Sequence, residues 1–195
     1  FSGTNHYQKL YFHTLGELQS EDRLVYERRD EKEWGFGGQV TEDGRFLVIS
    51  VWKGTLRKNQ LFYQDLENPD AGVVELISGF DASYDFLGNI AGAFWIMTNH
   101  EAPQRRIIRI DLEPPQRAHW DEIIAEQEDT LADASMVGGT LAASYLPHAP
   151  SQVRLHSTAG TPPPTVAPPV FATSSRFGGP PDHRAPPPPL PHLPP

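Results

Sequence analysis

The stretch Leu61–Leu66 (LFYQDL) recurs as Ile107–Leu112 (IIRIDL), and this recurrence decides the fold. The two copies lie 46 positions apart (107 minus 61), and both begin with two large apolar residues and end in Asp-Leu. The same step forward reaches Val153–Leu155 (VRL), and a step of 51 positions back (61 minus 10) reaches Leu10–Leu15. A period of about 40 to 50 residues is typical of repeat architectures.

A second apolar strand precedes each of the three later copies. These strands are nearly unbroken apolar runs, which favours β-structure that is covered on both faces. They are Phe46–Trp52, Ala93–Met97 and Leu141–Tyr145. The tight turns expected before them are Asp43-Gly44, Gly88-Asn89 and Gly138-Gly139. Gly and Asn tolerate the positive φ that tight turns require. Each buried strand is also expected to form a hairpin with the strand that follows it.

A fourth strand completes the repeat. Val73–Ile77 (VVELI) and Trp120–Ile124 (WDEII) lie 47 positions apart (120 minus 73) and suit half-exposed outer strands. Four strands in about 46 residues is the size of one β-propeller blade. A β-sandwich also has closely spaced strands, but it does not predict this period. We therefore predict an all-β partial β-propeller of about three four-stranded antiparallel blades: the end of one blade at 9–15, blades near 35–77 and 83–124, and a third from about 131.

The composition changes near Gly160. Of the 20 prolines, 14 lie in residues 161–195. Proline cannot donate to a β-ladder, so the third blade is expected to lack its fourth strand near 167–171, where the sequence reads APPVF. We predict a partial propeller over 1–160 and a disordered or polyproline tail over 161–195. Two readings of the tail stay open: a PxxP-like ligand at Pro186, Pro189, Leu190 and Pro191, or a stretch read in a shifted frame.

Net charge, cysteine content and the length of apolar runs exclude several classes of protein. A formal net charge of −9 argues against a nucleic-acid partner, and the pairs Arg28-Arg29 and Arg105-Arg106 are expected at solvated strand ends. The absence of cysteine excludes disulfides, a thiolate nucleophile and a cysteine-type zinc site. The sequence starts at Phe1 and contains neither a signal-peptide pattern nor an apolar run long enough to span a membrane. We expect a soluble, cytoplasmic fragment that binds neither nucleic acid nor membrane.

The N-terminal third carries a specific combination of short motifs. They are Gly3-Thr4, Gln8–Tyr11, His13, Leu15-Gly16, Gln19–Asp22, Trp34 with Gly35, Gly37 and Gly38, and Asp43–Arg45. The strings NPD, FDASYDFLGN, DLEPPQRAHWDEII and EQEDTL follow. Together they resemble the propeller of the prolyl oligopeptidase family over about residues 1–158, and the resemblance is expected to end after Thr158.

This resemblance implies a function. Members of the family are serine endopeptidases that cleave short peptides after proline, and they pair an α/β-hydrolase domain with a seven-bladed propeller that covers the active site. Their catalytic serine, aspartate and histidine lie in the hydrolase domain, after the propeller. The chain is therefore expected to be a gating portion of such an enzyme, with short proline-containing peptides and the hydrolase domain of the parent chain as partners. It is expected to be inactive alone, with no catalytic, cofactor or metal residues.

A search for chemistry in the residues agrees with this expectation. No GxSxG string is present, and Ser78 is expected in a turn. His100, His119, His148 and His156 lack metal-ligand spacing and are expected at the surface or in loops. Solvated loop charges are expected for the carboxylates that might otherwise bind calcium or act as acid and base, namely Glu42-Asp43, Asp81 with Asp85, and Glu126, Glu128 and Asp129.

The segment WGFGG at Trp34–Gly38 offers two readings. Its aromatic rings and bare backbone suit a ligand platform, and they equally suit crowded packing in an innermost strand, which we favour.

A second function class also stays open: a stand-alone repeat module that binds a partner through its open blade edge or its proline tail. That module is expected to be a stable monomer or a defined complex, whereas a fragment is expected to self-associate through its uncovered strand edges.

Overall fold

The computed structural model describes residues 6–113, 120–146 and 152–159. Within these residues the chain consists of β-strands and two short 3₁₀ helices, η1 (Gln19–Glu21) and η2 (Pro69–Ala71). Two compact units divide the chain, Phe1–Thr130 and Leu131–Pro195. The all-β prediction is confirmed, while the predicted proline tail lies outside the described residues.

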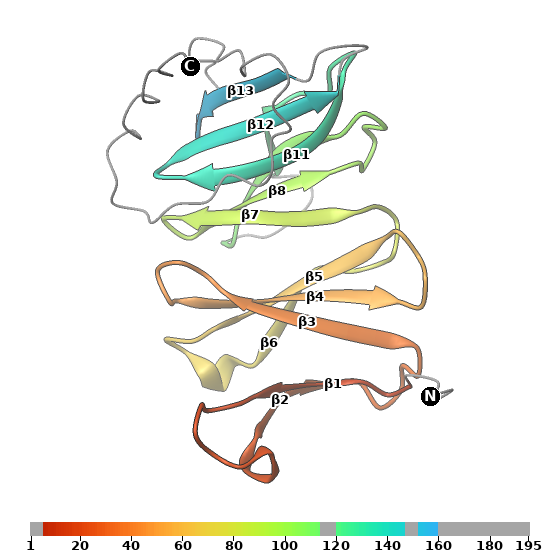
Figure 1. Cartoon of the computed structure of the whole chain (residues 1–195), viewed down its shortest axis with the longest axis vertical. Helices are drawn as coiled ribbons and strands as arrows, with labels where there is room; N and C mark the ends of the chain where they lie inside the picture. The colour runs from red at the N-terminus through yellow and green to blue at the C-terminus, as the bar shows by residue number, and fades with distance from the viewer. Residues whose placement is uncertain (1–5, 114–119, 147–151, 160–195) are drawn as a thin grey trace, which may run out of the picture. The chain divides into compact units, whose positions relative to one another are not determined.

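Two complete antiparallel sheets form the middle of the first unit (Figure 1). Sheet 2 has the order β3-β4-β5-β6, and sheet 3 has the order β10-β9-β8-β7. The strands of sheet 2 are β3 (Trp34–Val40), β4 (Phe46–Lys53), β5 (Asn59–Asp65) and β6 (Val73–Ile77). Those of sheet 3 are β7 (Tyr84–Ile90), β8 (Ala93–Thr98), β9 (Arg106–Asp111) and β10 (Trp120–Ile124). Both predicted blades, near 35–77 and 83–124, are confirmed.

Sheet 1 has two strands, β1 (Lys9–Phe12) and β2 (Arg23–Glu27). The position of β1 matches the predicted end of a blade at 9–15. Strand β2 was not predicted, because its five residues, RLVYE, contain an apolar run of only three residues and are flanked by charge. It pairs with β1 as β6 pairs with β5, and it therefore corresponds to an outer strand.

The second unit contains sheet 4, with the order β11-β12-β13. Its strands are β11 (Thr130–Val137), β12 (Thr140–Leu146) and β13 (Gln152–Ser157). The Gly138-Gly139 turn lies where the sequence predicts it, and both residues have positive φ, 54° and 73°. The third predicted blade thus begins at 130, and the residues near 167–171, where its fourth strand was expected to fail, lie outside the described ones.

One predicted turn is wrong. Gly88 and Asn89 lie inside β7, next to a register shift between Phe86 and Gly88, and the turn to β8 is made by Ala91 and Gly92. Their φ values are 48° and 77°, as a two-residue hairpin turn requires. The Gly-Asn pair is the stronger turn signal in the sequence, but here Gly88 stands at a bulge, which glycine also favours.

Apolar side chains on the facing surfaces of sheets 2 and 3 hold the two sheets together. Phe46, Val48 and Leu61 from sheet 2 pack against Phe94, Ile96 and Ile108 from sheet 3. Phe46 lies edge-on to Phe94, with ring centroids 5.3 Å apart. Full burial of each such side chain is worth about 1.5 to 3 kcal/mol. Strand β8 is buried along its whole length, as its unbroken apolar run predicts.

The opposite surface of sheet 2 packs on sheet 1. Trp34, Phe36 and Phe62 form a cluster with Leu10 and Tyr26. Gly38 lets β1 approach closely, because a Cβ at that position would lie 3.2 Å from Leu10 Cδ2. The favoured reading of the WGFGG segment, crowded packing of an aromatic strand, is what these contacts show.

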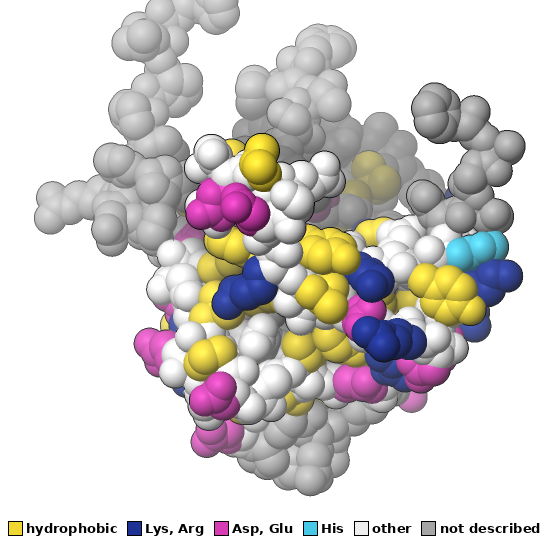
Figure 2. All heavy atoms as spheres, turned by 90° about the horizontal axis from the view of Figure 1, so that it is seen from below, with side chains coloured by type: hydrophobic (Ala, Val, Ile, Leu, Met, Phe, Trp, Pro, Cys, Tyr) yellow, Lys and Arg dark blue, Asp and Glu magenta, His cyan; other side chains and the backbone are white. Residues whose placement is uncertain are grey.

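The exposed apolar residues concentrate at sheet 1. Of the twelve large hydrophobic side chains that are exposed in the described part of the chain, six lie within residues 7–24: Tyr7, Tyr11, Phe12, Leu15, Leu18 and Leu24. Figure 2 views this end of the molecule and shows hydrophobic side chains interspersed with basic and acidic ones. Among the described residues no helix is long and apolar enough to cross a membrane.

Candidate functional site: polar seams between sheets 2 and 3

Sheets 2 and 3 pack face to face, and their loops lie at the two ends of this interface, where the strands end. The β3–β4 turn, the β7–β8 turn and the β5–β6 connection lie at one rim, which we name the turn rim (Figure 1). The β4–β5 and β8–β9 connections and the link from β6 to β7 lie at the opposite rim, which we name the link rim. Since each chain reversal leaves backbone groups outside the ladders, these rims are where polar side chains are required.

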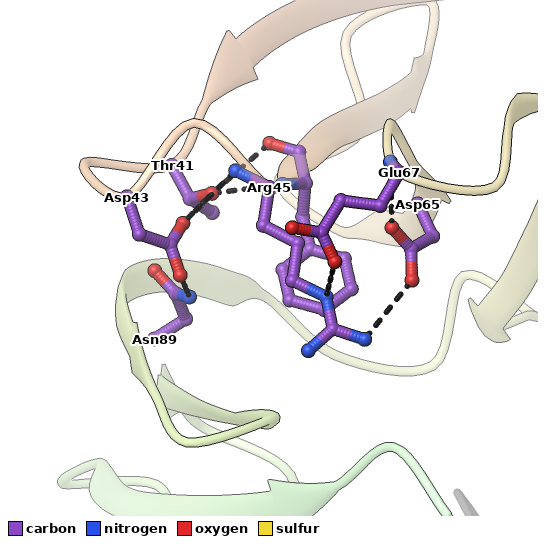
Figure 3. A network of polar contacts seen from close by, with 7 residues as sticks. Thr41, Asp43, Arg45, Asp65, Glu67 and Asn89 are labelled. Atoms are coloured by element: carbon purple, nitrogen blue, oxygen red, sulfur yellow. Dashed lines mark hydrogen bonds and ion pairs between the residues drawn. The ribbon is translucent and has the colours of Figure 1, made fainter.

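Asp43 is the centre of the turn rim (Figure 3). Its Oδ1 accepts hydrogen bonds from Thr41 Oγ1 at 2.6 Å and from the Arg45 backbone N–H at 3.1 Å. Its Oδ2 accepts a bond of 2.7 Å from Asn89 Nδ2, which belongs to β7. The buried Thr41 hydroxyl also accepts from the Phe46 backbone N–H at 2.9 Å. One carboxylate therefore closes the β3–β4 turn and joins it to the next sheet.

Arg45 extends this network along the rim. Its Nη2 donates to Asp65 Oδ2 at 3.1 Å, and its Nε lies 3.5 Å from Glu67 Oε2. Asp65 Oδ1 accepts in turn from the Glu67 backbone N–H at 2.9 Å. The guanidinium carbon lies 4.7 Å from the centre of the Phe46 ring, within cation–π range. Arg45 thus ties the β3–β4 turn to the end of β5.

The ionisation of these groups follows from their contacts. Partial burial favours the neutral form of Asp43, but hydrogen bonds from Thr41, the Arg45 backbone and Asn89 outweigh it and lower its pKa. Burial likewise opposes ionisation of Asp65, and the bond from Arg45 lowers the pKa of that carboxyl. The Asp65 bond raises the pKa of Arg45. Asp43 and Asp65 are therefore carboxylates, and Arg45 is a guanidinium cation, near neutral pH.

Asn59 closes the link rim. Its side chain pairs with the backbone of Tyr84 in both directions: Nδ2 donates to the Tyr84 carbonyl at 2.8 Å, and Oδ1 accepts from the Tyr84 N–H at 2.7 Å. The backbone N–H of Asn59 also donates to the Ala82 carbonyl at 3.1 Å. These three bonds continue the ladder of sheet 2 into the first strand of sheet 3.

A histidine lies on the same rim, within sheet 3. His100 stacks on Tyr84 with centroids 6.3 Å apart and lies edge-on to Trp120 at 5.9 Å. Its Nε2 lies 3.6 Å from Asp81 Oδ2, and Asp81 Oδ1 accepts from the Tyr84 hydroxyl at 2.9 Å. The His100 backbone N–H donates to Thr98 Oγ1 at 3.0 Å, and this hydroxyl donates in turn to the Ser83 carbonyl at 2.7 Å. Because the hydroxyl bonds to backbone groups, the cluster resembles structural packing rather than a catalytic dyad.

Among the described residues, the serine and histidine candidates from the sequence lie in loops or in a strand. Ser78 lies exposed in the link after β6, as predicted for a turn residue. His100 lies in the β8–β9 connection, but the prediction is wrong for His156, which lies in β13 with 5 % of its surface exposed. It pairs with the buried Leu141 of β12, and its place in the strand alternation directs it inward. His119 and His148 lie outside the described residues.

The carboxylates divide into two groups. Glu42, Asp85 and Glu128 are exposed, as expected for solvated charges. Asp43, Asp81 and Glu126 are exposed as well, as expected, but they also accept hydrogen bonds: those of Asp43 and Asp81 are described above, and Glu126 accepts one from the Gln104 backbone N–H. Arg28 also departs from the prediction of a solvated strand end, because it contacts Glu75 at 2.9 Å and covers the Trp34 ring at 4.7 Å.

The residues that fasten the seams were missed by the sequence reasoning. Asn59 carries no motif, and its only signal was its place before an Asp-Leu strand. Asn89 was assigned to a Gly88-Asn89 turn, and its distance of 46 positions from Asp43 (89 minus 43) was not used. In the described part of the chain no group of three or more His, Cys, Asp or Glu side chains is arranged to hold a metal ion. The polar contacts at both rims therefore connect sheets 2 and 3 and hold them together.

Comparison with known families decides the assignment. The sequence profile described as "Prolyl oligopeptidase, N-terminal beta-propeller domain" matches residues 2–185. The chain belongs to the prolyl oligopeptidase family. The match to this propeller domain extends past Thr158, where the resemblance was expected to end, while the predicted domain boundary at 160 stays a prediction.

Several prolyl oligopeptidases are similar in sequence. Prolyl oligopeptidase A of Amanita bisporigera is 38 % identical over 111 residues, which cover 55 % of the chain and 15 % of that protein. The prolyl endopeptidase of Elizabethkingia meningoseptica is 30 % identical over 159 residues, which cover 82 % of the chain and 22 % of that protein. The chain thus spans about a fifth of the length of these relatives, and the match does not cover their catalytic domain.

Solved structures of the family share the fold. A prolyl endopeptidase from a study of two such enzymes and their inter-domain dynamics superposes with a TM-score of 0.78 at 31 % identity, over 87 % of the chain and 25 % of that protein. Prolyl oligopeptidase B from Galerina marginata, without ligand, superposes with a TM-score of 0.76 at 28 % identity, over 84 % and 24 %. The partial propeller predicted from the 46-residue repeat is confirmed.

Proposed function

We propose that residues 1–160 form the gating part of a prolyl oligopeptidase-like serine endopeptidase, which hydrolyses short peptides after proline. The α/β-hydrolase domain of the same parent chain supplies the catalytic groups, and short proline-containing peptides are the substrates. The match of residues 2–185 to the family's propeller domain is the observation that carries this proposal.

The seams between sheets 2 and 3 give this part its mechanical role. A gate that admits short peptides and excludes folded chains has to keep its blades from separating. The Asp43–Asn89 bond at one rim and the Asn59–Tyr84 pair at the other fasten the sheets at both ends of the apolar interface.

A chimeric enzyme tests the proposal. The segment of the Elizabethkingia meningoseptica prolyl endopeptidase that matches this chain is replaced by the matching residues of this chain. We expect hydrolysis of a short proline-containing chromogenic peptide to persist, together with exclusion of a folded protein substrate. A folded, soluble chimera that has lost the exclusion, or that no longer cleaves the short peptide, would contradict the proposal.

The chain of 195 residues is proposed to be inactive alone. Assay of the purified chain with the same chromogenic peptide is expected to give no turnover above the blank. Turnover that survives repurification would show that these residues carry a catalytic site of their own. The cytoplasm remains the proposed compartment, and fractionation of cells that express the parent gene, followed by immunoblotting, tests it.

A further inference from the structure

The β4–β5 loop and the end of β4 form a positively charged segment of an acidic chain. Residues 52–58 read WKGTLRK and contain three basic residues and no acidic one, whereas the whole chain has a formal net charge of −9. Lys53 is half-buried, and Arg57 and Lys58 are exposed. The charge of this segment is therefore opposite in sign to the net charge of the molecule.

The three basic side chains of this segment have no partner among the described residues. Lys53, Arg57 and Lys58 form neither a side-chain hydrogen bond nor an ion pair there. Ion pairs hold many other basic side chains of the first unit, namely Lys9, Arg28, Arg29, Arg45, Arg106 and Arg109. An unpaired cation is available to a ligand at once, whereas a paired one must first give up its carboxylate.

Trp52 adds an aromatic surface beside these charges. It stands opposite Gly35 of β3, and 37 % of its surface is exposed. A Cβ at Gly35 would lie 2.3 Å from ring atom Cε2, so the indole lies directly on the backbone of β3. Leu56, in the loop, is exposed as well. Aromatic and basic side chains together are typical of protein recognition surfaces.

The loop is held in place at both ends. At its start, the Gly54 N–H donates to the Glu33 carbonyl at 3.2 Å, and the Leu56 N–H donates to the Lys53 carbonyl at 3.1 Å. At its end, Asn59 bonds to the first strand of sheet 3, as described above. A loop that is fixed before binding loses less conformational entropy when a ligand binds.

The charges and the apolar side chains together select the chemistry of a partner. Carboxylates complement the three cations, and apolar side chains between them can pack on Trp52 and Leu56. A long polyanion such as nucleic acid is disfavoured, because its phosphates beyond the loop would face a molecule of net charge −9. A short acidic peptide confines its charge to the loop.

We propose that Trp52, Lys53, Leu56, Arg57 and Lys58, which we name the cationic loop surface, bind an acidic peptide segment of a partner protein, with apolar side chains between its carboxylates. This binding requires no activity of the parent enzyme. The proposal therefore stands or falls separately from the function proposed above.

Fluorine NMR of the full chain tests the proposal. The four tryptophans are labelled with 5-fluorotryptophan, and Trp52→Phe assigns the Trp52 resonance. The probe is a hexapeptide of alternating glutamate and leucine, acetylated and amidated so that its ends carry no charge. We expect the probe to move the Trp52 resonance and to leave the other three in place. An unmoved Trp52 resonance would overturn the proposal.

Two further probes test the chemistry of the partner. Hexapeptides in which lysine replaces glutamate, or serine replaces leucine, are each expected to bind about tenfold more weakly or less. Equal binding of either one would refute the acidic, apolar partner. A single-stranded oligonucleotide that moves the Trp52 resonance at lower concentration than the glutamate-leucine probe would also overturn this choice of partner.

Matched charge variants test the surface itself, with affinities measured by isothermal calorimetry. Arg57→Ser combined with Lys58→Ser is expected to weaken binding of the glutamate-leucine probe about tenfold. Lys9→Ser combined with Arg23→Ser removes the same two charges from sheet 1 and is expected to leave the affinity unchanged. Trp52→Leu is expected to weaken binding as well. Equal losses in the two charge variants, or none with Trp52→Leu, would refute the cationic loop surface.

Discussion

Two asparagine side chains connect sheets 2 and 3, and each does so by bonding to a group that a sheet or turn leaves unpaired. Asn59 satisfies both backbone groups of Tyr84, and Asn89 donates to the carboxylate that closes the β3–β4 turn. An amide suits this place because it offers a donor and an acceptor at a fixed spacing. Asn59 stands in no recognisable motif, and the Gly88-Asn89 pair predicted a turn instead of this contact, because each asparagine bonds to a partner more than 20 positions away.

Loss of the Asn59 side chain is expected to destabilise the fold. Asn59→Ala leaves the Tyr84 N–H and carbonyl without their partner, which costs about 1 to 3 kcal/mol in the free energy of unfolding. Urea titration followed by tryptophan fluorescence measures this. Asn59→Asp, which keeps the acceptor and loses the donor, is expected to fall between wild type and alanine. As a control, the exposed Asn68→Ala is expected to change the free energy of unfolding by less than about 0.5 kcal/mol.

The turn rim is expected to make stability depend on pH. The folded pKa of Asp43 is lowered, so the folded chain binds fewer protons than the unfolded chain as the pH falls below about 4. The contribution of Asp43 is complete above that pH and is lost as the pH falls through the lower folded pKa. Asp43→Asn is therefore expected to reduce the decline in unfolding free energy between about pH 5 and pH 2.

The matched control for this experiment is Glu42→Gln. It removes the same charge from the same turn, but Glu42 is exposed and accepts none of the hydrogen bonds of the rim. Its acid denaturation curve is expected to follow that of wild type. If Glu42→Gln and Asp43→Asn flatten the curve equally, the effect is one of net charge, and the proposed role of the Asp43 hydrogen bonds is wrong.

At the scale of elements, apolar periodicity predicted the strands well. The outer strands 73–77 and 120–124 and the central strands from Phe46, Ala93 and Leu141 lie within about one residue of their expected positions, because their burial demands unbroken or alternating apolar residues. Strand β2 and the Ala91-Gly92 turn were missed. Their sequences are ordinary, and it is the pairing with neighbouring strands that imposes their conformation.

The β7–β8 turn offers a stabilising substitution. Ala91 has φ of 48°, a conformation that costs an alanine about 1 kcal/mol or more. Ala91→Asn creates an Asn-Gly turn, which favours positive φ at both central positions, and is expected to raise the free energy of unfolding by about 0.5 to 1 kcal/mol. Thermal unfolding monitored by circular dichroism measures the change. Ala91→Val is the opposing control and is expected to lower stability, since a β-branched residue disfavours positive φ; a stabilising valine would refute the argument from φ.

At the scale of the whole molecule, the 46-residue period decided the architecture before any single strand did. A repeat of stacked sheets buries each sheet between two neighbours, and sheet 2 has both of its faces covered in this way. The period could not predict the seams, because the stacking of sheets depends on loop conformations that carry no periodic signal.

The outer face of sheet 1 is expected to drive self-association of the chain. Tyr11 and Leu24 pair across β1 and β2, and both are among the exposed apolar side chains of residues 7–24. Contiguous apolar surface of this kind marks an interaction site or an aggregation liability.

We expect the purified chain to show concentration-dependent association in size-exclusion chromatography with light scattering. We expect Tyr11→Thr combined with Leu24→Lys to shift the chain to the monomer. Trp52→Leu removes an exposed apolar side chain from sheet 2 and serves as the control, with association unchanged. A chain that remains monomeric at all concentrations would instead favour the stand-alone interaction module.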